Sequence, residues 1–505
     1  MDITGTPGET GAHDAAERVL ALDLGTGSVK AGVMGPDGRL GETAARDYPL
    51  LTPGEDRAEA DPARWWAATR EVVRELRALP SDPLDDLSGV AIAGQMHGVV
   101  LADGQGTPLR PAVLWPDRRA QQQLTRYREA DDAALRRLGN PLVPGMMGPI
   151  LSSLRADEPE VVARARWALS PKDWLRTRLT GPEGVDGPCA EPSDASATLL
   201  WDLEADDWHD EIVELLALPR GLLPPIVRSE RIVGRLTTSA AAELQLIPDT
   251  PVIAGAADTA AALRGADTPP GALQLGIGTG AQWVRPLDGA TVDTRTLEPE
   301  QGLHCYRAAG EGWYAMAAVQ NAGLAFEWAW EVLDAGWDEA HRALEATEPG
   351  AQGVVFLPFL TGERTPHLDP GLRAAWLGAG RAHRRAHLLR AVFEGVAFAI
   401  RAARDALDGP ARDAPVRLVG GGTTEPRWQA LLADVLDTEV QVVDEPEATL
   451  RGAGLLALSA LEGEAGPGPS PLRPRATQRP GPNAPAYQAA FTHYTERVHA
   501  SRGAG

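Results

Sequence analysis

The sequence VLALDLGTGSVKAGVM, residues 19–34, consists of two apolar runs that flank a short glycine turn. Apolar runs of this length, bounded by turn residues, are typical of buried strands. We therefore expect one strand over residues 19–24, a tight turn over Gly25-Thr-Gly-Ser28, and a returning strand over residues 29–34. Together they form a β-hairpin that carries an acid, Asp23, at its bend.

A second copy of this pattern occurs about half the chain away, where residues 273–284 read LQLGIGTGAQWV. When the two segments are superposed, Gly278-Thr-Gly280 falls on Gly25-Thr-Gly27, and Gly276 falls on Asp23. Internal self-similarity of this kind indicates a duplicated structural unit. The repeat predicts two related domains that face each other, each presenting a turn to a shared ligand.

The chemistry of these turns suits phosphate. A glycine turn directs consecutive backbone N–H groups and a hydroxyl into one concavity. A carboxylate such as Asp23 is tolerated beside a polyphosphate chiefly when Mg²⁺ lies between them. The pairing predicts ATP-Mg binding, with phosphate contacts from Gly25, Thr26, Gly27, Gly278, Thr279 and Gly280.

Strands and helices alternate along the rest of the chain, which predicts an α/β fold. We expect helices over residues 64–79 and 169–179 and a strand over residues 87–93. A new block begins near Pro251. The expected organisation is a disordered leader (1–17), an N-terminal domain (18–250), a C-terminal domain (251–461), and a Pro/Gly-rich loop with a terminal helix near 487–498 (462–505).

Asp258 closes an apolar strand and precedes an alanine-rich helix. One interpretation is a helix N-cap. The other is a general base that accepts the proton of a substrate hydroxyl during phosphoryl transfer, a reaction that needs little else from the protein beyond positioning and charge neutralisation.

The Gly420-Gly-Gly422 turn follows an expected strand over residues 416–419 and precedes a helix from Pro426, which favours a nucleotide-binding turn. A dinucleotide fingerprint is the rival interpretation, although Glu425 occupies its third glycine position. No Walker A pattern occurs in the sequence, which excludes a P-loop kinase at the level of motifs.

Composition excludes further classes. The 505 residues predict two or three domains, and the net charge of −22 argues against a general nucleic-acid or membrane-surface binder. No stretch approaches the ~20 apolar residues of a membrane helix, so the cytoplasm is the default location. Cys189 and Cys305 form no disulfide framework. Lys30 and Lys172 are the only lysines, and for Lys30 we hypothesise a place near phosphate.

Ordered motifs from Val19 to Leu456 resemble the FGGY family of carbohydrate kinases, and within it the xylulokinases. Besides the turns above, they are Ala93-Gly-Gln-Met-His-Gly98, Pro171-Lys-Asp-Trp-Leu175, Ser193-Asp-Ala-Ser-Ala197, Ala254-Gly-Ala-Ala-Asp258, Phe356-Leu-Pro-Phe-Leu-Thr-Gly-Glu-Arg-Thr-Pro-His367 and Glu447-Ala-Thr-Leu-Arg-Gly-Ala453.

The resemblance implies two actin-like (ribonuclease H-like) domains with ATP and a sugar in the cleft between them. It makes Asp258 the catalytic base, and Asp23 together with Asp258 the Mg²⁺ site. Adenosine would lie beside Gly421 and Gly422. The residues expected to contact the sugar are Gln95, Met96, His97, Asp258 and Thr259. The expected partners are small molecules, with no nucleic acid and no membrane, and a homodimer is compatible with this picture.

Two departures bear on the substrate. Pro116 stands where the family usually has Asn, and Thr259 where xylulokinases usually have Asn. The interpretations left open are D-xylulose, another ketopentose or polyol, a non-catalytic sensor on the same fold, and an oxidoreductase. Arg364 and His367 either line the site or hold their loop, and taken alone His97 is a structural histidine.

Overall fold

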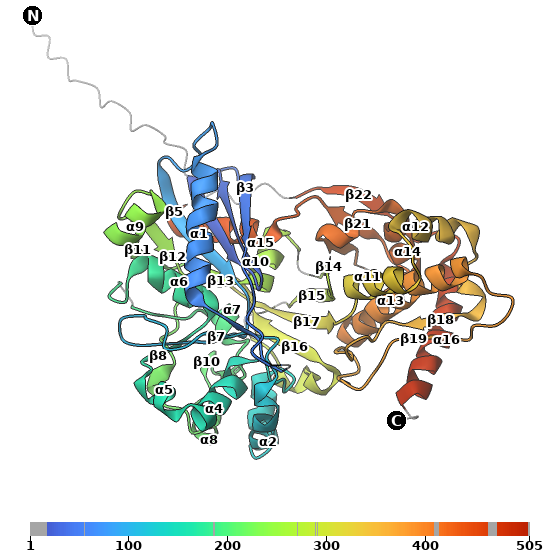
Figure 1. Ribbon diagram of the computed structural model, residues 1–505, viewed down its shortest axis with the longest axis horizontal. Helices are drawn as coiled ribbons and strands as arrows, with labels where there is room; N and C mark the ends of the chain where they lie inside the picture. Colours follow the sequence, from blue (N-terminus) through green and yellow to red (C-terminus); the bar gives the residue numbers. More distant parts are fainter. Residues whose placement is uncertain are drawn as a thin grey trace, which may run out of the picture.

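The computed structural model describes residues 18–502 except 55, 185–186, 270, 288, 290, 409–413 and 463–471. The chain folds into two lobes, each built on a seven-stranded sheet with helices packed against it (Figure 1). This is the α/β, two-domain architecture expected from the sequence. The expected leader, residues 1–17, lies outside the described residues.

The first sheet has the strand order β11-β12-β5-β1-β2-β3, and β13 pairs with β5 off this path. β1 is antiparallel to β2 and parallel to β5, so the hairpin predicted from residues 19–34 is confirmed. The strands of this sheet are β1 (Arg18–Leu24), β2 (Ser28–Met34), β3 (Leu40–Asp47), β5 (Leu87–Gly94), β11 (Ile232–Arg235), β12 (Pro251–Ile253) and β13 (Ala256–Ala257).

The second sheet repeats this plan in the order β16-β17-β15-β14-β20-β21-β22. An antiparallel hairpin is followed on one side by an antiparallel strand, and on the other by two parallel strands and an antiparallel edge. The predicted internal repeat is therefore present in the topology. The strands are β14 (Leu273–Ile277), β15 (Ala281–Leu287), β16 (Leu303–Arg307), β17 (Trp313–Val319), β20 (Val416–Val419), β21 (Val440–Val443) and β22 (Pro474–Gln478).

Alternation along β1 explains how the first sheet is covered, since successive strand residues point to opposite faces. Leu20 and Leu22 pack in one cluster with Trp65 of helix α1 (Pro62–Arg77). Val19 and Ala21 pack in another with Leu450 of helix α15 (Ala448–Glu462). Helix α15 comes from the second half of the sequence, yet it packs against β1 and β5 of the first sheet (Figure 1).

Two glycines allow α15 to approach helix α10 (Asp258–Gly265) closely. A Cβ on Gly265 would collide with the carbonyl oxygen of Ala448, and a Cβ on Gly452 with that of Ala261. Any larger residue would push the two backbones apart. This close contact holds the middle and the end of α10, the helix that Asp258 begins, against a helix that follows β21 of the second sheet.

The other helices and strands surround these two sheets. In the first lobe they are α2 (Leu124–Tyr127), α3 (Asp132–Leu138), α4 (Met147–Asp157), α5 (Pro159–Arg164), α6 (Pro171–Thr180), α7 (Pro192–Ala195), α8 (Asp210–Leu215), α9 (Thr238–Leu244), β4 (Glu59–Ala60), β6 (Val100–Ala102), β7 (Ala112–Val113), β8 (Trp167–Leu169), β9 (Trp201–Asp202) and β10 (Asp207–Trp208). In the second they are α11 (Gly323–Val332), α12 (Trp337–Ala346), α13 (Arg385–Asp408), α14 (Pro426–Leu436), α16 (Ala484–Arg502), β18 (Val355–Leu357) and β19 (Ala375–Leu377). None of the helices among the described residues is long and apolar enough to cross a membrane.

Two expectations about organisation need correction. Strands β12 and β13, which were expected to open the C-terminal domain at residue 251, instead pair with β5 in the first sheet. The chain enters the second sheet only at β14. In the segment expected to be a loop, residues 463–471 lie outside the described residues, and β22 adds an edge strand to the second sheet. Local composition can predict that a segment forms a strand, but it cannot predict which sheet the strand joins, because its pairing partners are distant in sequence.

Candidate active site

The two predicted carboxylates lie at the same edge of the first sheet. Asp23 of β1 and Ala257 of β13 are in register with Ala93 and Gly94 of β5. Asp258 follows β13 directly and begins α10. Because the carboxyl ends of β1, β5 and β13 coincide, the fold gathers there side chains that are far apart in the sequence. Ligands of open α/β sheets bind at this edge.

Burial raises the pKa of both carboxylates, and the charge of Asp258 adds to the shift of Asp23. Burial, followed by the negative charge of Asp258, raises the pKa of Asp23 to about 7, while Lys30 opposes the shift. Burial also raises the pKa of Asp258 to about 6. Oδ1 of Asp23 has no hydrogen-bond partner among the described residues. The pair therefore forms a desolvated anionic site that a cation would stabilise.

The structure also shows how Asp258 is held. Its Oδ1 accepts a hydrogen bond from the backbone N–H of Thr259 at 2.6 Å and lies 3.2 Å from the Thr259 hydroxyl. Thr259, a departure from the xylulokinase pattern, thus contacts the candidate base itself. Ala257, not Asp258, is the N-cap residue of α10, and its side chain makes no capping bond.

The first glycine turn is tightly braced. The N–H of Gly25 donates to the carbonyl of Ser28 at 2.9 Å, and the carbonyl of Gly25 accepts from Gln95 Nε2 at 3.2 Å and from the Tyr48 hydroxyl. Thr26 Oγ1 accepts a hydrogen bond from Trp115 Nε1 at 2.9 Å. A Cβ on Gly27 would contact nothing. Of the three residues, Gly27 leaves the most room for a ligand.

The second turn, Gly278–Gly280, also leaves open space beside one of its glycines. Gly280 is required because a Cβ there would lie 2.6 Å from the carbonyl oxygen of Val319, whereas Gly278 faces open space. The carbonyls of Gly278 and Thr279 accept hydrogen bonds from Ala322, Gly323 and Leu324 at the start of α11. The turn is thereby attached to a helix N-terminus, where backbone dipoles favour negative charge.

The Gly420–Gly422 turn lies beside this second turn. A Cβ on Gly422 would lie 2.8 Å from the carbonyl oxygen of Ile277, the residue before Gly278. Gly420 adopts φ +87°, a conformation that favours glycine, and Gly421 faces open space. The second lobe therefore brings two bare backbone turns together, as binding of one nucleotide requires.

Gln95, Met96 and His97 follow β5 and reach the same edge of the first sheet. Gln95 and Met96 are buried, and Oε1 of Gln95 has no hydrogen-bond partner among the described residues. His97 Nδ1 lies 2.6 Å from the carbonyl oxygen of Ala197, which can only accept, so Nδ1 carries the proton. Burial lowers the pKa of His97 to about 4. The neutral ring leaves Nε2 as an acceptor for a hydroxyl.

Arg364 of the second lobe faces this group. Its positive charge lowers the pKa of His97, and its guanidinium carbon lies 5.4 Å from the centre of the Trp115 ring. Arg364 therefore lies beside His97 and Trp115 of the first lobe. His367, by contrast, packs edge-on against Phe359 in its own loop, with ring centres 5.6 Å apart.

Sequence reasoning missed a polar group that joins the lobes. The Tyr306 hydroxyl of β16 lies 2.6 Å from His304 Nδ1, and the amide oxygen Oδ1 of Asn140 in the first lobe lies 3.1 Å from the same nitrogen. Asn140 also donates to the carbonyl of Cys305 at 3.1 Å. No local motif marks these residues, because they meet only when β16 packs against the first lobe.

Lys30 lies opposite Asp23 in the hairpin and is paired with a carboxylate. Its Nζ lies 2.7 and 3.0 Å from the two carboxylate oxygens of Glu447, just before α15. Asp117, the residue after Pro116, is buried, and its carboxylate accepts hydrogen bonds from Arg119 Nε and from the backbone N–H of Ala58, each at 2.8 Å, so it ties its loop to the segment before β4.

Two lobes of duplicated topology, glycine turns after their strands and a pair of desolvated carboxylates at one sheet edge are typical of a phosphotransferase of the two-domain sugar-kinase class. Comparison with known proteins agrees. The model of the FGGY family of carbohydrate kinases, N-terminal domain, matches residues 18–265, and that of the C-terminal domain matches residues 292–461. The chain belongs to the FGGY family of carbohydrate kinases, and it is an ATP-dependent sugar phosphotransferase.

Individual relatives agree with this assignment. The chain is 31% identical over 448 residues to a xylulose kinase of Lactococcus lactis, covering 87% of each chain. A crystal structure described as a xyloylose kinase from Brucella ovis superposes with a TM-score of 0.88 at 30% identity, covering 97% of this chain and 100% of that one. A Plasmodium falciparum glycerol kinase with ADP shares the fold, with a TM-score of 0.82 at 20% identity over 96% and 98% of the chains.

Proposed function

We propose that this protein transfers the γ-phosphate of ATP to D-xylulose and forms D-xylulose 5-phosphate. The observation that carries the proposal is the convergence of Asp23, the Gln95–His97 segment and Asp258 at one edge of the first sheet. The similarity to xylulose kinases supports the choice of sugar. Because the phosphate donor is ATP, we also propose the cytoplasm as the location.

In this mechanism Asp258 is the general base. Its carboxylate takes the proton of the attacking sugar hydroxyl, the new bond forms between that oxygen and the γ-phosphorus, and the bond to the β-phosphate oxygen breaks to release ADP. The hydrogen bonds from Thr259 orient the carboxylate and favour its charged form. Burial raises its proton affinity, which suits a base that must accept a proton at neutral pH.

The carboxylates of Asp23 and Asp258 fit a divalent cation. Oδ1 of Asp23 is buried without a hydrogen-bond partner among the described residues, and the charge of Asp258 adds to the burial that raises the pKa of Asp23, which Lys30 offsets only in part. No cluster of three or more metal-ligating side chains occurs in the described part of the chain, so phosphate and water would complete the coordination, as Mg²⁺ commonly prefers. A bound Mg²⁺ would neutralise charge on the transferred phosphoryl group.

The remaining residues bind and orient the two substrates. We propose that Gly278, Thr279 and Gly280 contact the phosphates of ATP together with Gly25, Thr26 and Gly27, and that Gly421 and Gly422 flank the adenosine. Gln95 Oε1 and His97 Nε2 accept hydrogen bonds from sugar hydroxyls, and Met96 supplies an apolar wall.

A coupled ADP-release assay with ATP-Mg and a panel of ketopentoses, aldopentoses, polyols and glycerol tests the proposal. We expect the highest kcat/KM with D-xylulose and only slow ADP release without sugar. A maximum with another acceptor would overturn the choice of D-xylulose and point to Pro116 and Thr259 as the residues that altered specificity. No stimulation by any acceptor would overturn the activity.

A His97→Ala variant sharpens the assay. Loss of the Nε2 acceptor should raise the KM for the sugar about fivefold while the KM for ATP stays within twofold of the wild-type value, because one hydrogen bond to a substrate is worth about 1 kcal/mol. An equal rise in both KM values would contradict a role confined to the sugar.

A further inference from the structure

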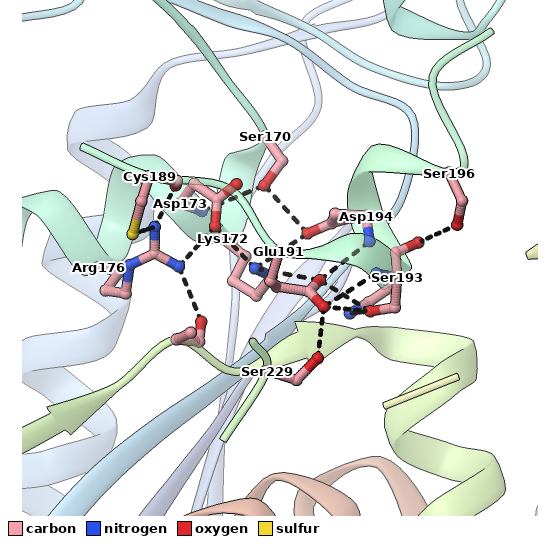
Figure 2. A network of polar contacts seen from close by, with 12 residues as sticks. Ser170, Lys172, Asp173, Arg176, Cys189, Glu191, Ser193, Asp194, Ser196 and Ser229 are labelled. Atoms are coloured by element: carbon pink, nitrogen blue, oxygen red, sulfur yellow. Dashed lines mark hydrogen bonds and ion pairs between the residues drawn. The ribbon is translucent and has the colours of Figure 1, made fainter. Parts of the chain in front are cut away.

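The segment Ser193-Asp-Ala-Ser-Ala197, around helix α7, is part of the family resemblance but has no role in the mechanism above. It lies in a buried polar network in the first lobe, shown in Figure 2. Ser193 and Asp194 are almost inaccessible to solvent. Buried polar groups persist only when they are satisfied, so a network of this size needs a structural or functional reason.

The network is centred on Lys172 of α6, one of the two lysines of the chain. Its Nζ lies 2.7 Å from Asp173, 3.1 Å from Asp194 and 3.6 Å from Glu191, and the side chain is fully buried. Arg176 adds a second cation, 2.7 Å from Asp173. Burial raises the pKa of Asp194, so the two cations are paired chiefly with the carboxylates of Asp173 and Glu191.

Glu191 connects this cluster to Ser193. Its carboxylate accepts hydrogen bonds from the backbone N–H groups of Ser193 and Asp194, each at 2.9 Å, and from the Ser229 hydroxyl at 2.8 Å. It also accepts from the Ser193 hydroxyl at 2.7 Å. A carboxylate cannot donate, so the Ser193 proton points to Glu191 and the lone pairs of Ser193 Oγ are free to accept.

The donor to those lone pairs is the peptide next to the candidate base. The N–H of Ala257, the residue immediately before Asp258, donates to Ser193 Oγ at 2.9 Å. Ala197 lies four residues after Ser193, and its carbonyl oxygen accepts a hydrogen bond from His97 Nδ1 at 2.6 Å. The same short segment therefore contacts the backbone of the base and the ring of the sugar-site histidine.

We propose that Ser193 is a positioning residue for phosphoryl transfer: its hydroxyl, oriented by Glu191, fixes the Ala257 peptide and so places the Asp258 carboxylate against the sugar hydroxyl. This inference rests on the proposed role of Asp258. Within it, Lys172 and Arg176 are the buried cations that keep the Glu191 anchor in a region closed to water.

The physical basis is the cost of an unpaired buried donor. Without the Ser193 hydroxyl, the Ala257 N–H loses its acceptor, and the end of β13 must shift or admit water to satisfy it. A shift of about 1 Å in a reacting group lowers turnover roughly 100-fold, because the near-attack geometry is lost. Substrate binding should change little, since Ser193 touches neither turn.

The test compares Ser193→Ala with Ser229→Ala in the full-length protein. Both variants delete a buried hydroxyl that donates to Glu191, but only Ser193 contacts the Ala257 peptide. In steady-state assays with D-xylulose, or the best acceptor of the panel, we expect Ser193→Ala to lower kcat 10- to 100-fold. The KM values for ATP and sugar should stay within twofold. Ser229→Ala should keep kcat within twofold.

Thermal unfolding of both variants separates catalysis from folding. A kcat loss limited to Ser193→Ala at similar melting temperatures supports the inference. An unchanged kcat in Ser193→Ala, or an equal loss in Ser229→Ala, overturns it. If Ser193→Ala does not fold, Ser193→Cys under reducing conditions carries the same prediction, because sulfur is a weaker acceptor.

Asp258→Asn, assayed in parallel, keeps the two proposals distinguishable. Full turnover in Asp258→Asn refutes the general base whatever Ser193 does. An inactive Asp258→Asn combined with a fully active Ser193→Ala refutes only the positioning role.

Discussion

The two glycine hairpins share a topology but not a charge. In the first lobe Asp23 stands across the ladder from Lys30, whereas in the second Gly276 occupies the matching position across from Gln282. Asp23 is desolvated with a raised pKa, while a Cβ on Gly276 would meet only Val419, at 3.6 Å. One copy of the repeat thus offers a carboxylate suited to a cation, and the other offers bare backbone suited to phosphate. The two hairpins therefore share their backbone geometry, and the single difference between Asp23 and Gly276 gives them different ligand preferences.

The largest effect should come from the anionic side of this comparison. Asp258→Asn removes the base but keeps the size of the side chain, so kcat should fall about 10²- to 10⁴-fold, the usual contribution of general acid–base catalysis. The KM for ATP should rise by a smaller factor than kcat falls, because Asp23 remains as the second carboxylate of the proposed cation site. Near-normal turnover in steady-state assays would show that Asp258 is not the base.

Giving the second hairpin the charge of the first should break the asymmetry. Gly276→Asp places a carboxylate near the Gly278–Gly280 turn, away from the Mg²⁺ proposed beside Asp23. Repulsion between this carboxylate and the phosphates of ATP should raise the KM for ATP at least tenfold. Gly276→Ala is the matched control, since a methyl group there would make an ordinary van der Waals contact with Val419 at 3.6 Å. We expect the KM of Gly276→Ala for ATP to stay within twofold of the wild-type value. Equal KM values in the two variants would contradict an electrostatic origin.

The buried cluster of the first lobe should make stability depend on pH. The folded-state pKa of Asp194 is raised to about 8 from an ordinary value of 3.8. The folded protein therefore holds a proton that the unfolded chain releases, and stability falls as pH rises from about 4 to about 8. In urea unfolding at several pH values, Asp194→Asn should show a smaller decline over this range than the wild type. A parallel decline would mean that Asp194 does not hold the proton.

The smallest effect should come from Lys30, the first hairpin's link to the second half of the chain. The Lys30 and Glu447 side chains are 35% and 26% exposed, and such pairs contribute roughly 1 kcal/mol or less. Lys30→Ala should therefore lower the melting temperature by only a few degrees, with the KM for ATP unchanged. A tenfold rise in that KM would instead place Lys30 near phosphate, as its position in the sequence first indicated.

Much of the site could be predicted because its residues lie at strand ends with local signatures. The paired hairpins, the strand before Asp258 and the Gly420–Gly422 turn all depend on short-range patterns of apolar residues and glycine. Tyr306 and His304 carry no such signature: they are alternate residues of an ordinary strand, and they reach Asn140 only because β16 packs against the first lobe.

The sequence by itself determined the duplicated hairpins, the two carboxylates and the glycine turns, because the steric preferences of glycine and the period of a strand act within a few residues. Tertiary structure alone decided that β12 and β13 join the first sheet and that α15 packs beside α10. It also decided that Ser193 supports the peptide before Asp258. Strand pairing, helix contact and buried hydrogen bonds join residues distant in sequence, and their partners are chosen by the packing of the whole chain.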